Sequence, residues 1–529
     1  MELPAGPARA GLSCPRHVPV HRRGRQPPGT PESRVAHQCF APDEVFVHAR
    51  RLTETPGAED GGKEACGIFG VFAPGEDVAR ITFYGLYALQ HRGQESAGIA
   101  TADGERLHLR TGMGLVAQVF DETDLGLLPG HIAIGHTRYS TTGSSRVVNA
   151  QPIRARGVHG ELALAHNGNL INAALLRPEL EAQGITFHSS TDSEVIAHLL
   201  VNAEGPDWER RMATVMERIA GSYCLVVLTP TALLAARDPM GNHPLCLGRI
   251  GEGWVVASET CALDHLGARF VREVQPGEVV VIDWSGLRSF QAVESRREAL
   301  CIFEYIYFAR PDSVIRGERI YPIRMAMGRE LAREHPVDAD VVIGVPDSAT
   351  AAAIGYARES GIPYVEGLMK NRYVGRTFIQ PDQRIREAGV HLKFNPVSEF
   401  LDGQRVVVVD DSIVRGTTTP RVVQMLRQAG AREVHMRICA PPIRHPCYFG
   451  VDMASRAELI AAQKSVAEIE RHLNADSLGY LSLEGLLRAV GMPGESFCLA
   501  CFTGEYPIPI PLALDKLSLE RVPLVQLGT

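Results

Sequence analysis

Two short strings contain the residues with the clearest chemical potential. In "GGKEACGIFGVF", Cys66 stands between a charged leader and the glycine that opens an expected strand. In "VVVVDDSIVRGTTTP", Asp410 and Asp411 end an expected strand and precede a loop rich in hydroxyls. A cysteine thiolate is a nucleophile, whereas paired acids beside backbone amides suit a phosphorylated sugar with a free diol. The chain is therefore expected to hold two chemically different sites.

Cys66 needs a base, because a free cysteine has a pKa of about 8.5 and only the thiolate is reactive. The α-amino group of the same residue, with a pKa of about 7.7–8.0, can accept the proton at neutral pH. It is free only if Cys66 is the first residue of the mature chain. The residues before it are rich in Arg, Pro and Gly and are expected to be disordered, which is consistent with a removable leader.

Three downstream strings supply groups that fit a glutamine substrate. Arg138 in "GHTRYSTTG" can pair with the α-carboxylate, and Asp192 in "SSTDSE" with the α-ammonium group. In "LAHNGNL", the Asn167 side chain and the Gly168 N–H can form an oxyanion hole. Each motif alone has a simpler explanation: Asn-Gly is typical of a hairpin turn, TDSE of a helix N-cap, and a lone cysteine of a buried core position.

The loop after Asp411 spans residues 412–419 and leads into an expected helix. Its backbone amides, its threonine hydroxyls and the helix N-terminus suit a phosphate monoester, and ligands of parallel sheets bind at such strand ends. A GxxxxGK[ST] string is absent from the sequence, which disfavours nucleoside triphosphate hydrolysis. The simpler explanation is that the two acids only cap the helix that follows.

Taken in order, "CGIFG", "LQHRGQESAGIA", "HTRYSTTG", "HNGNL" and "TDSE" resemble the class II (N-terminal nucleophile) glutamine amidotransferases. The Asp410–Asp411 string resembles the signature of the type I phosphoribosyltransferases. Together, over roughly residues 62–510, they resemble the glutamine phosphoribosylpyrophosphate amidotransferase family. This implies that Cys66, freed by self-cleavage, hydrolyses glutamine. Ammonia would then pass through an internal channel to C1 of phosphoribosyl pyrophosphate (PRPP), giving phosphoribosylamine, pyrophosphate and glutamate at the start of purine biosynthesis.

The same resemblance assigns the second site residue by residue. The ribose hydroxyls would be held by Asp410 and Asp411, and one Mg²⁺ per subunit by these two acids with Ser348 of "GVPDSAT". The remaining PRPP-binding residues would be Ser412, Arg415, Gly416, Thr417, Thr418, Lys370 and Arg372. The basic string "KNRYVGRTFIQP", which also contains Arg376, would close over the pyrophosphate; its simpler explanation is a solvated surface loop.

Cysteines supply a third group of ligands. The CxxC pair Cys498 and Cys501 alone could be a redox pair or half of a zinc site. With Cys301 in "CIFEYIYFARPDS" and Cys447 in "PPIRHPCYFG", it resembles the iron–sulfur branch of the family, which implies one [4Fe–4S] cluster per subunit that ties down the C-terminal segment. A Cys₄ zinc site competes with this interpretation. The other cysteines considered, Cys439, Cys224, Cys246 and Cys261, are expected to be core residues.

The elements that must position these residues change in character along the chain. Short apolar runs such as "HIAIGHTRYS", "ELALAHNGNL" and "EVVVIDWSG" predict antiparallel sheets covered by helices, up to about residue 297. Beyond it, strand–loop–helix–strand patterns predict a parallel sheet, with a strand in "IPYVEGL" and a helical segment over 456–493. The resemblance implies an α/β protein: an N-terminal αββα sandwich of the N-terminal nucleophile hydrolase type, followed by a type I phosphoribosyltransferase parallel-sheet domain.

Four segments are expected: a disordered leader over 1–65, a glutamine amidotransferase domain over 66–297, a phosphoribosyltransferase domain over 298–470, and a C-terminal helical segment with iron–sulfur ligands and tail over 471–529. Residues 1–45 are expected to lie upstream of the true translation start. The net charge of −7 indicates no nucleic-acid footprint. No apolar run reaches about 18 residues and no secretory signal is present, so we expect a cytoplasmic enzyme without membrane contact. By resemblance, purine nucleotides inhibit it and it forms homotetramers or dimers.

Two other functions fit part of the chain. A glutaminase that makes glucosamine phosphate or asparagine shares the N-terminal strings but lacks "VVVVDDSIVRGTT". A regulator that binds PRPP without turnover carries the phosphate loop but no complete glutamine site. The combination of Cys66, Arg138, Asn167 and Asp192 argues against the regulator.

Overall fold

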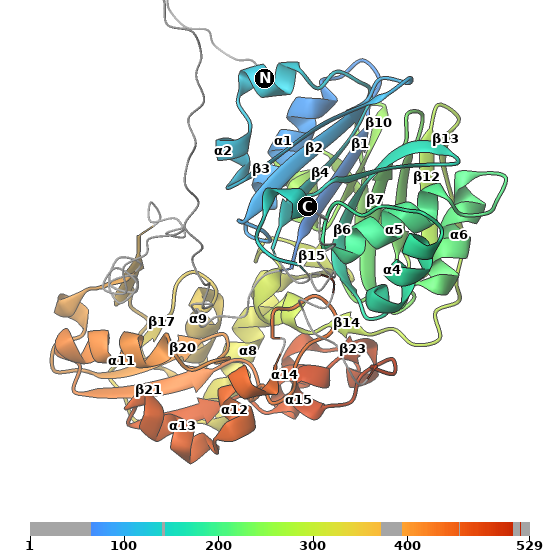
Figure 1. Ribbon diagram of the computed structural model, residues 1–529. Coiled ribbons are helices and arrows are strands. Elements are labelled where there is room, and N and C mark those ends of the chain that lie inside the picture. Colours follow the sequence, from blue (N-terminus) through green and yellow to red (C-terminus); the bar gives the residue numbers. More distant parts are fainter. Residues whose placement is uncertain (1–64, 140–142, 372–393, 454, 512–518, 520–529) are drawn as a thin grey trace, which may run out of the picture. The chain divides into compact units, whose positions relative to one another are not determined.

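The computed structural model describes residues 65–139, 143–371, 394–453, 455–511 and 519, and its first half is built on two antiparallel sheets (Figure 1). One has seven strands in the order β11-β9-β10-β1-β4-β2-β3. These are β1 Gly67–Phe72, β2 Ser96–Ala102, β3 Leu107–Met113, β4 Ile132–Arg138, β9 Cys246–Ile250, β10 Gly253–Ala257 and β11 Arg269–Glu273.

The second antiparallel sheet has six strands in the order β13-β12-β8-β7-β6-β5. These are β5 Ile153–Gly157, β6 Gly160–Leu170, β7 Gly221–Leu228, β8 Leu233–Arg237, β12 Glu278–Asp283 and β13 Gly286–Gln291.

Alternation along β6 shows why the two sheets stack. Ala163 and Ala165 join a core with Ile68 and Ile134 of the first sheet, whereas Leu162 and Leu164 face the opposite side. Small residues in one register and leucines in the other follow from the two-residue period of a strand. The sheets therefore share one buried layer, and each keeps a second apolar face for helices.

Helices cover both outer faces. The first sheet packs against α1 Val78–Ala88, α2 Val116–Val119, α3 Glu122–Gly126 and α7 Thr260–His265. The second packs against α4 Ala173–Ala182, α5 Asp192–Val201 and α6 Trp208–Arg218, which lie beside β6 and β7 in Figure 1. The predicted αββα sandwich is confirmed.

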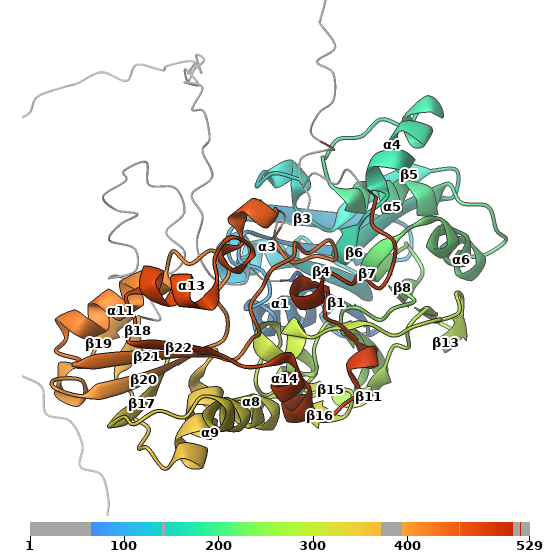
Figure 2. The same cartoon turned by 90° about the horizontal axis from the view of Figure 1, so that it is seen from below.

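The second half is built on a parallel sheet of four strands in the order β17-β20-β21-β22. These are β17 Val341–Gly344, β20 Arg405–Asp410, β21 Glu433–Ile438 and β22 Ser477–Tyr480. In β20, Val407 and Val409 pack toward α8 Ile320–Glu334 and α9 Thr350–Ser360. Val406 and Val408 pack toward α11 Thr419–Gln428 and α13 Val466–Leu473, on the other face of the sheet in Figure 2. The predicted parallel-sheet transferase fold is confirmed.

Two local expectations are wrong. The segment 456–493 is not helical throughout, because β22 interrupts it and adds an edge strand beside β21. It also holds α12 Ile460–Gln463 and α14 Leu483–Val490. The segment "IPYVEGL" forms no strand of the parallel sheet. It contributes a single bridge at Tyr364, and its last residue begins the short strand β18 Leu368–Lys370, which pairs with β19 Phe394–Pro396. β22 and the "IPYVEGL" segment each contain a glycine and are too short for a period to be read from them.

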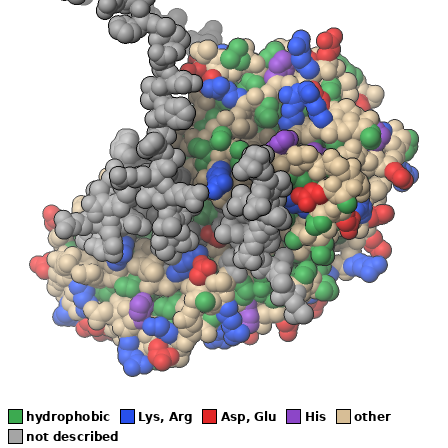
Figure 3. Space-filling view, viewed as in Figure 1, with side chains coloured by type: hydrophobic (Ala, Val, Ile, Leu, Met, Phe, Trp, Pro, Cys, Tyr) green, Lys and Arg blue, Asp and Glu red, His purple; other side chains and the backbone are tan. Residues whose placement is uncertain are grey.

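Short strands connect the end of the chain to the start of the second half. β14 Leu300–Cys301 pairs in parallel with β23 Phe497–Cys498, next to α15 Ala500–Thr503. β14 is followed by the π-helix η2 Glu304–Phe308 and by the hairpin of β15 Val314–Ile315 and β16 Glu318–Arg319. On the face shown in Figure 3, described basic and acidic side chains are interspersed. Among the described helices, none combines the length and apolarity needed to cross a bilayer.

Candidate functional site

Four of the predicted glutamine-site residues lie around one cavity with an empty volume of about 240 Å³. Cys66 lies directly before β1, Arg138 ends β4, Gly168 lies in β6 and Asp192 begins α5. The cavity is lined by Cys66, Arg138, Tyr139, Gln151, His166, Gly168, Thr191, Asp192 and Ser193. Groups from both sheets and one helix thus converge on the nucleophile.

Cys66 is buried and its sulfur is held by one neighbour. Its Sγ donates to the Tyr139 carbonyl at 3.3 Å and accepts from the Tyr139 N–H at 3.4 Å. Burial raises the pKa of the Cys66 thiol to about 11, against smaller lowering effects from Tyr139 and Arg138. The thiol is therefore protonated at neutral pH, and a nearby base is required for it to act as a nucleophile.

The charged residues expected to hold the substrate are themselves held in place. Arg138 Nη1 lies 2.6 Å from Glu95 Oε1, and both side chains are buried. Asp192 Oδ2 accepts from the Leu170 N–H at 2.9 Å. Thr191 caps α5 by accepting from the Glu194 N–H, so the N-cap explanation of "TDSE" is also correct. Arg138 is thus held by an ion pair at the end of β4, and Asp192 is held at the start of α5 by a hydrogen bond from β6.

The predicted oxyanion hole has a distinctive feature. Asn167 is 1% exposed, and neither its Nδ2 nor its Oδ1 has a hydrogen-bond partner among the described residues. Asn167 and Gly168 lie inside β6, paired with β7, so the hairpin-turn explanation of Asn-Gly is wrong. Gly168 has φ +144°, and a Cβ there would lie 2.2 Å from the Ser222 carbonyl oxygen. An unpartnered buried amide is costly, and both atoms of this amide are free to bind a ligand in the cavity.

Sequence reasoning missed Tyr139, Gln151 and His166 as neighbours of the nucleophile. His166 precedes Asn167; its N–H donates to Gln151 Oε1 at 2.8 Å and its ring Nδ1 lies 3.2 Å from Ser193 Oγ. Burial lowers the pKa of His166, so the ring is neutral beside Asp192. The only signal in the sequence was the position of this histidine directly beside Asn167.

The predicted phosphate site also assembles, at the carboxyl ends of β17 and β20. Ser348 Oγ donates to Asp411 Oδ2 at 2.5 Å, and Ser412 Oγ donates to Asp411 Oδ1 at 2.7 Å. Burial raises the pKa of Asp411, and these two bonds oppose the shift. Asp410 ends β20, whereas the N-cap residue of α11 is Thr418, so neither acid occupies the capping position of that helix. Ser348, Asp410 and Asp411 offer the oxygen ligands that Mg²⁺ prefers.

The other predicted PRPP contacts are placed as follows. Lys370 Nζ lies 2.8 Å from Asp347 Oδ2, which puts it beside the 344–350 loop. Arg415 Nη2 lies 2.6 Å from Glu458 Oε2. Gly416 has φ +69°, and Thr418 is the N-cap of α11 with Thr417 before it. Arg372 and Arg376 lie outside the described residues.

The four predicted iron–sulfur cysteines line a second cavity, with an empty volume of about 300 Å³. Pairing of β14 with β23 places Cys301 opposite Cys498. The cavity is lined by Cys301, Phe303, Pro446, Cys447, Phe449, Val451, Met453, Cys498, Ala500, Cys501 and Tyr506. All four thiols are free, and Cys439 does not line the cavity. A buried apolar pocket with four thiols fits a cysteine-ligated metal group.

The spacing of these thiols bears on the metal. A single tetrahedral zinc ion, with Zn–S bonds of about 2.3 Å, would draw four sulfurs to within about 3.8 Å of one another. Within the described ranges, three or more ligand atoms gather within 4.8 Å of one another only at His91, Glu259 and Cys261, not among the four cavity cysteines. The wider arrangement favours a larger, polynuclear group.

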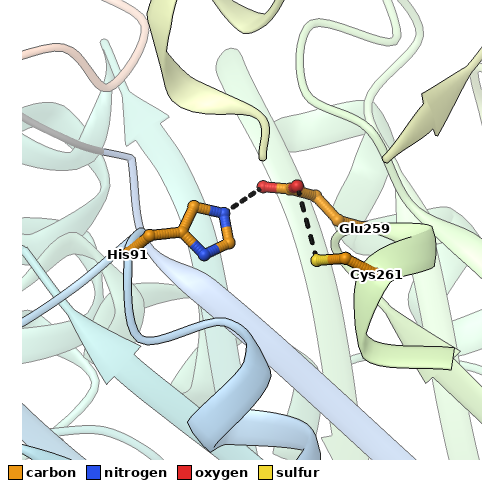
Figure 4. Close-up of side chains that lie close together, drawn as sticks. All are labelled: His91, Glu259 and Cys261. Atoms are coloured by element: carbon orange, nitrogen blue, oxygen red, sulfur yellow. Dashed lines mark hydrogen bonds and ion pairs between the residues drawn. The ribbon is translucent and has the colours of Figure 1, made fainter. Parts of the chain in front are cut away.

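The trio His91, Glu259 and Cys261 is shown in Figure 4. The Glu259 carboxylate already binds His91 Nε2 at 2.8 Å and Arg92 Nη1 at 2.5 Å, and it also accepts from Ser313 Oγ. His91 and Arg92 hold the pKa of Glu259 well below its usual range, despite its burial. Because its oxygens are already occupied by cations and donors, we interpret the trio as part of a buried ion-pair network. Cys224, Cys246 and Cys261 are all buried, as expected for core residues.

Comparison with known proteins accounts for both halves. Family models match a glutamine amidotransferase domain over residues 136–265 and a phosphoribosyl transferase domain over 321–450. The chain is 54% identical to amidophosphoribosyltransferases of Synechocystis sp. (87% of this chain, 94% of that protein) and of Archaeoglobus fulgidus (84% and 98%).

Solved structures give the same result. The chain is 48% identical to the glutamine phosphoribosylpyrophosphate amidotransferase of B. subtilis complexed with ADP and GMP, with TM-score 0.80 over 84% of this chain and 98% of that one. A structure described as the allosteric regulatory enzyme of purine biosynthesis is also 48% identical, with TM-score 0.82 over 87% and 100%. The chain belongs to the amidophosphoribosyltransferase family.

Proposed function

We propose that Cys66 hydrolyses glutamine and that the ammonia released replaces the pyrophosphate on C1 of PRPP, giving phosphoribosylamine. One observation carries the glutamine half: Cys66, Arg138 and Asp192 line one cavity beside the unpartnered buried amide of Asn167. The transferase half rests on the contact between Ser348 and Asp411 at the ends of two parallel strands.

In the first half-reaction, the free α-amino group of Cys66 takes the thiol proton and Sγ attacks the side-chain carbonyl carbon of glutamine. The Asn167 Nδ2 and the Gly168 N–H stabilise the resulting oxyanion. The ammonium group of Cys66 returns its proton to the leaving nitrogen, and the tetrahedral intermediate collapses to release ammonia and leave a γ-glutamyl thioester on Sγ. Water then attacks the thioester and releases glutamate. Arg138 and Asp192 hold the α-carboxylate and α-ammonium groups throughout.

In the second half-reaction, ammonia travels inside the protein, because free ammonia in water would be protonated and would lose its nucleophilic lone pair. Asp410 and Asp411 hold the ribose hydroxyls. The 412–419 loop, with Arg415, Gly416, Thr417 and Thr418, holds the 5′-phosphate at the start of α11. Lys370 and Arg372 contact the pyrophosphate. Mg²⁺ bound near Ser348 and the two acids would neutralise charge on the departing pyrophosphate.

The cofactor proposed for the second cavity is a [4Fe–4S] cluster held by Cys301, Cys447, Cys498 and Cys501. Support comes from the shared apolar cavity and from the finding that, within the described ranges, no three of these thiols lie within 4.8 Å of one another. When bound, such a cluster would cross-link the C-terminal segment to β14. We further propose that the protein is cytoplasmic and forms a homotetramer or homodimer. Purine nucleotides would inhibit it by occupying the ribose 5-phosphate site. The domain limits are proposed near residues 66, 297 and 470.

The deciding experiment compares pyrophosphate release from PRPP with glutamine and with ammonium salt as nitrogen source, on protein whose N-terminus is determined by intact mass. An N-terminus at Cys66 and activity with both sources are expected. A Cys66→Ala variant should keep only the ammonia reaction. A PRPP-binding regulator would release no pyrophosphate from either source, which would overturn the proposal.

A further inference from the structure

Residues Cys447–Gly450, here called the 447–450 segment, lie between the cysteine cavity and the glutamine site. Cys447 and Phe449 line the cysteine cavity. The Phe449 N–H donates to Cys447 Sγ at 3.4 Å, so the turn is held on the cavity side. The segment also contacts β6, which carries the oxyanion-hole residues, and the neighbouring strand β7. One short stretch of chain therefore borders two functional regions.

Gly450 approaches the backbone of Gly168 so closely that a side chain between them would be crowded. It has φ +109°, and a Cβ built on it would lie 3.2 Å from Gly168 Cα, 3.3 Å from Gly168 C and 3.2 Å from His243 Nε2. A Cβ on Gly168 would lie 2.2 Å from the Ser222 carbonyl oxygen, so Gly168 has close neighbours in both β7 and the 447–450 segment. A side chain at position 450 would have to push against the Gly168 backbone.

Three hydrogen bonds fasten the segment to the glutaminase half. Ser222 Oγ donates to the Phe449 carbonyl at 2.6 Å and also accepts from the Asn169 N–H at 3.2 Å. His243 Nε2 lies 2.9 Å from the same Phe449 carbonyl. Asn169 Nδ2 donates to the Tyr448 carbonyl at 3.1 Å. Two of these bonds come from Asn169, the residue after Gly168 in β6, and from Ser222, which pairs with Asn169 in β7, and the third comes from His243. They hold the 447–450 segment against the part of β6 that contains Gly168.

We propose that Gly450 is a positioning residue for the oxyanion hole, acting through Gly168, and that the 447–450 segment sets the rate of glutamine hydrolysis. This inference rests on the proposed function, in which the Gly168 N–H stabilises the oxyanion. An oxyanion donor interacts mainly with the transition state, so its displacement lowers kcat and leaves KM for glutamine nearly unchanged. The transferase site does not use this donor, so transfer from added ammonia is independent of it.

The test is Gly450→Ala in the processed full-length chain. We expect kcat with glutamine to fall by about tenfold or more, since loss of one oxyanion donor costs about 10²–10³ in kcat. KM for glutamine should stay within about twofold, and activity with ammonia and iron content should be unchanged. The matched control is Gly504→Ala. Gly504 also has a positive φ, +80°, and a Cβ there would press on the His445 ring. Gly504 follows α15 and has no close neighbour in β6.

A second variant keeps the test decisive if Gly450→Ala does not fold. Ser222→Ala removes one donor to the Phe449 carbonyl and should give the same kcat loss in smaller measure. Four results would each overturn the inference. In Gly450→Ala these are an equal loss of activity with glutamine and with ammonia, a raised KM for glutamine at constant kcat, or no change in kcat. The fourth is the same loss of glutamine-dependent kcat in Gly504→Ala. Failure of the proposed function has a different signature, because the unsubstituted chain would then release no pyrophosphate with glutamine.

Discussion

Arg92 and Glu304 form an ion pair in which both side chains are 0% exposed, with 2.7 Å between Nη2 and Oε1. The same guanidinium pairs with Glu259, and its Nε donates to the Cys66 carbonyl at 3.1 Å. Glu304 also lies 3.0 Å from His243 Nδ1. This network joins the nucleophile of the first half to η2, which opens the second half.

Glu304→Gln should destabilise the protein by about 3–5 kcal/mol, because removing one member of a buried pair leaves its partner uncompensated. Urea unfolding measures the change. The control is Glu359→Gln, which breaks the pair with Arg333, a side chain that is 55% exposed. An exposed pair is worth at most about 1 kcal/mol, so equal effects of the two substitutions would contradict this account.

Asn167→Leu should separate stability from activity. Both amide atoms of Asn167 are buried without a partner among the described residues, so an apolar residue of similar shape loses no hydrogen bond. We expect the melting temperature to stay constant or rise, while glutamine-dependent kcat falls by about 10²–10³ and the ammonia reaction persists. A clear loss of stability would indicate that the amide has a structural partner.

Asp411→Asn should abolish most transferase activity with either nitrogen source and leave glutamine hydrolysis intact. The substitution removes a charge that we place against both the ribose and Mg²⁺. Asp340→Asn is the matched control, since Asp340 pairs with Arg405 at the opposite end of β20. Pyrophosphate and glutamate release are measured in parallel; comparable losses in both variants would argue against the assigned role of Asp411.

Metal content distinguishes the cysteines. Anaerobically purified protein should be brown and contain iron and labile sulfide in equal amounts, and Cys447→Ala should lose both. Cys439→Ala should retain them, because Cys439 is buried outside the cavity that the four ligands line. Zinc in place of iron would refute the cluster and leave the four-cysteine site standing.

His136 gives a pH dependence of stability. Burial lowers its pKa from 6.5 to about 3, and its Nε2 donates to the His166 carbonyl at 3.0 Å. Below pH 6.5 the unfolded chain therefore binds a proton at His136 that the folded chain does not bind. The contribution of His136 to the free energy of unfolding falls as the pH falls from 6.5 toward 3. The drop in melting temperature between pH 7.5 and 5.5 should be smaller in His136→Gln. An equal drop in both proteins would mean that other groups control the effect.

Residue periodicity and motif order were enough to predict the sandwich, the parallel sheet and which residues gather at the two candidate sites. The apolar runs that contain Ala163 and Leu164, and Val406 and Val407, predict buried strands, and the motifs lie at strand ends that the topology brings together. Other features depend on packing that no local pattern encodes. The contact of Gly450 with Gly168 joins positions far apart in the sequence, and β22 is a strand only because β21 offers it an edge. The position of Gln151 beside His166 likewise follows from strand pairing.

The pairing of β14 with β23 has a consequence for the order of events in the cell. Cys301 leaves the ribosome long before Cys498 and Cys501, yet all three line one cavity. Domains fold as units from the N-terminus during synthesis, so the sandwich can form while the cavity is still open on one side. The pocket that we propose for the cluster is complete only once Cys498 and Cys501 have been made. Insertion of the proposed cluster therefore has to follow synthesis of residue 501, and a ribosome that stalls before codon 498 would leave a folded glutaminase half without a complete pocket.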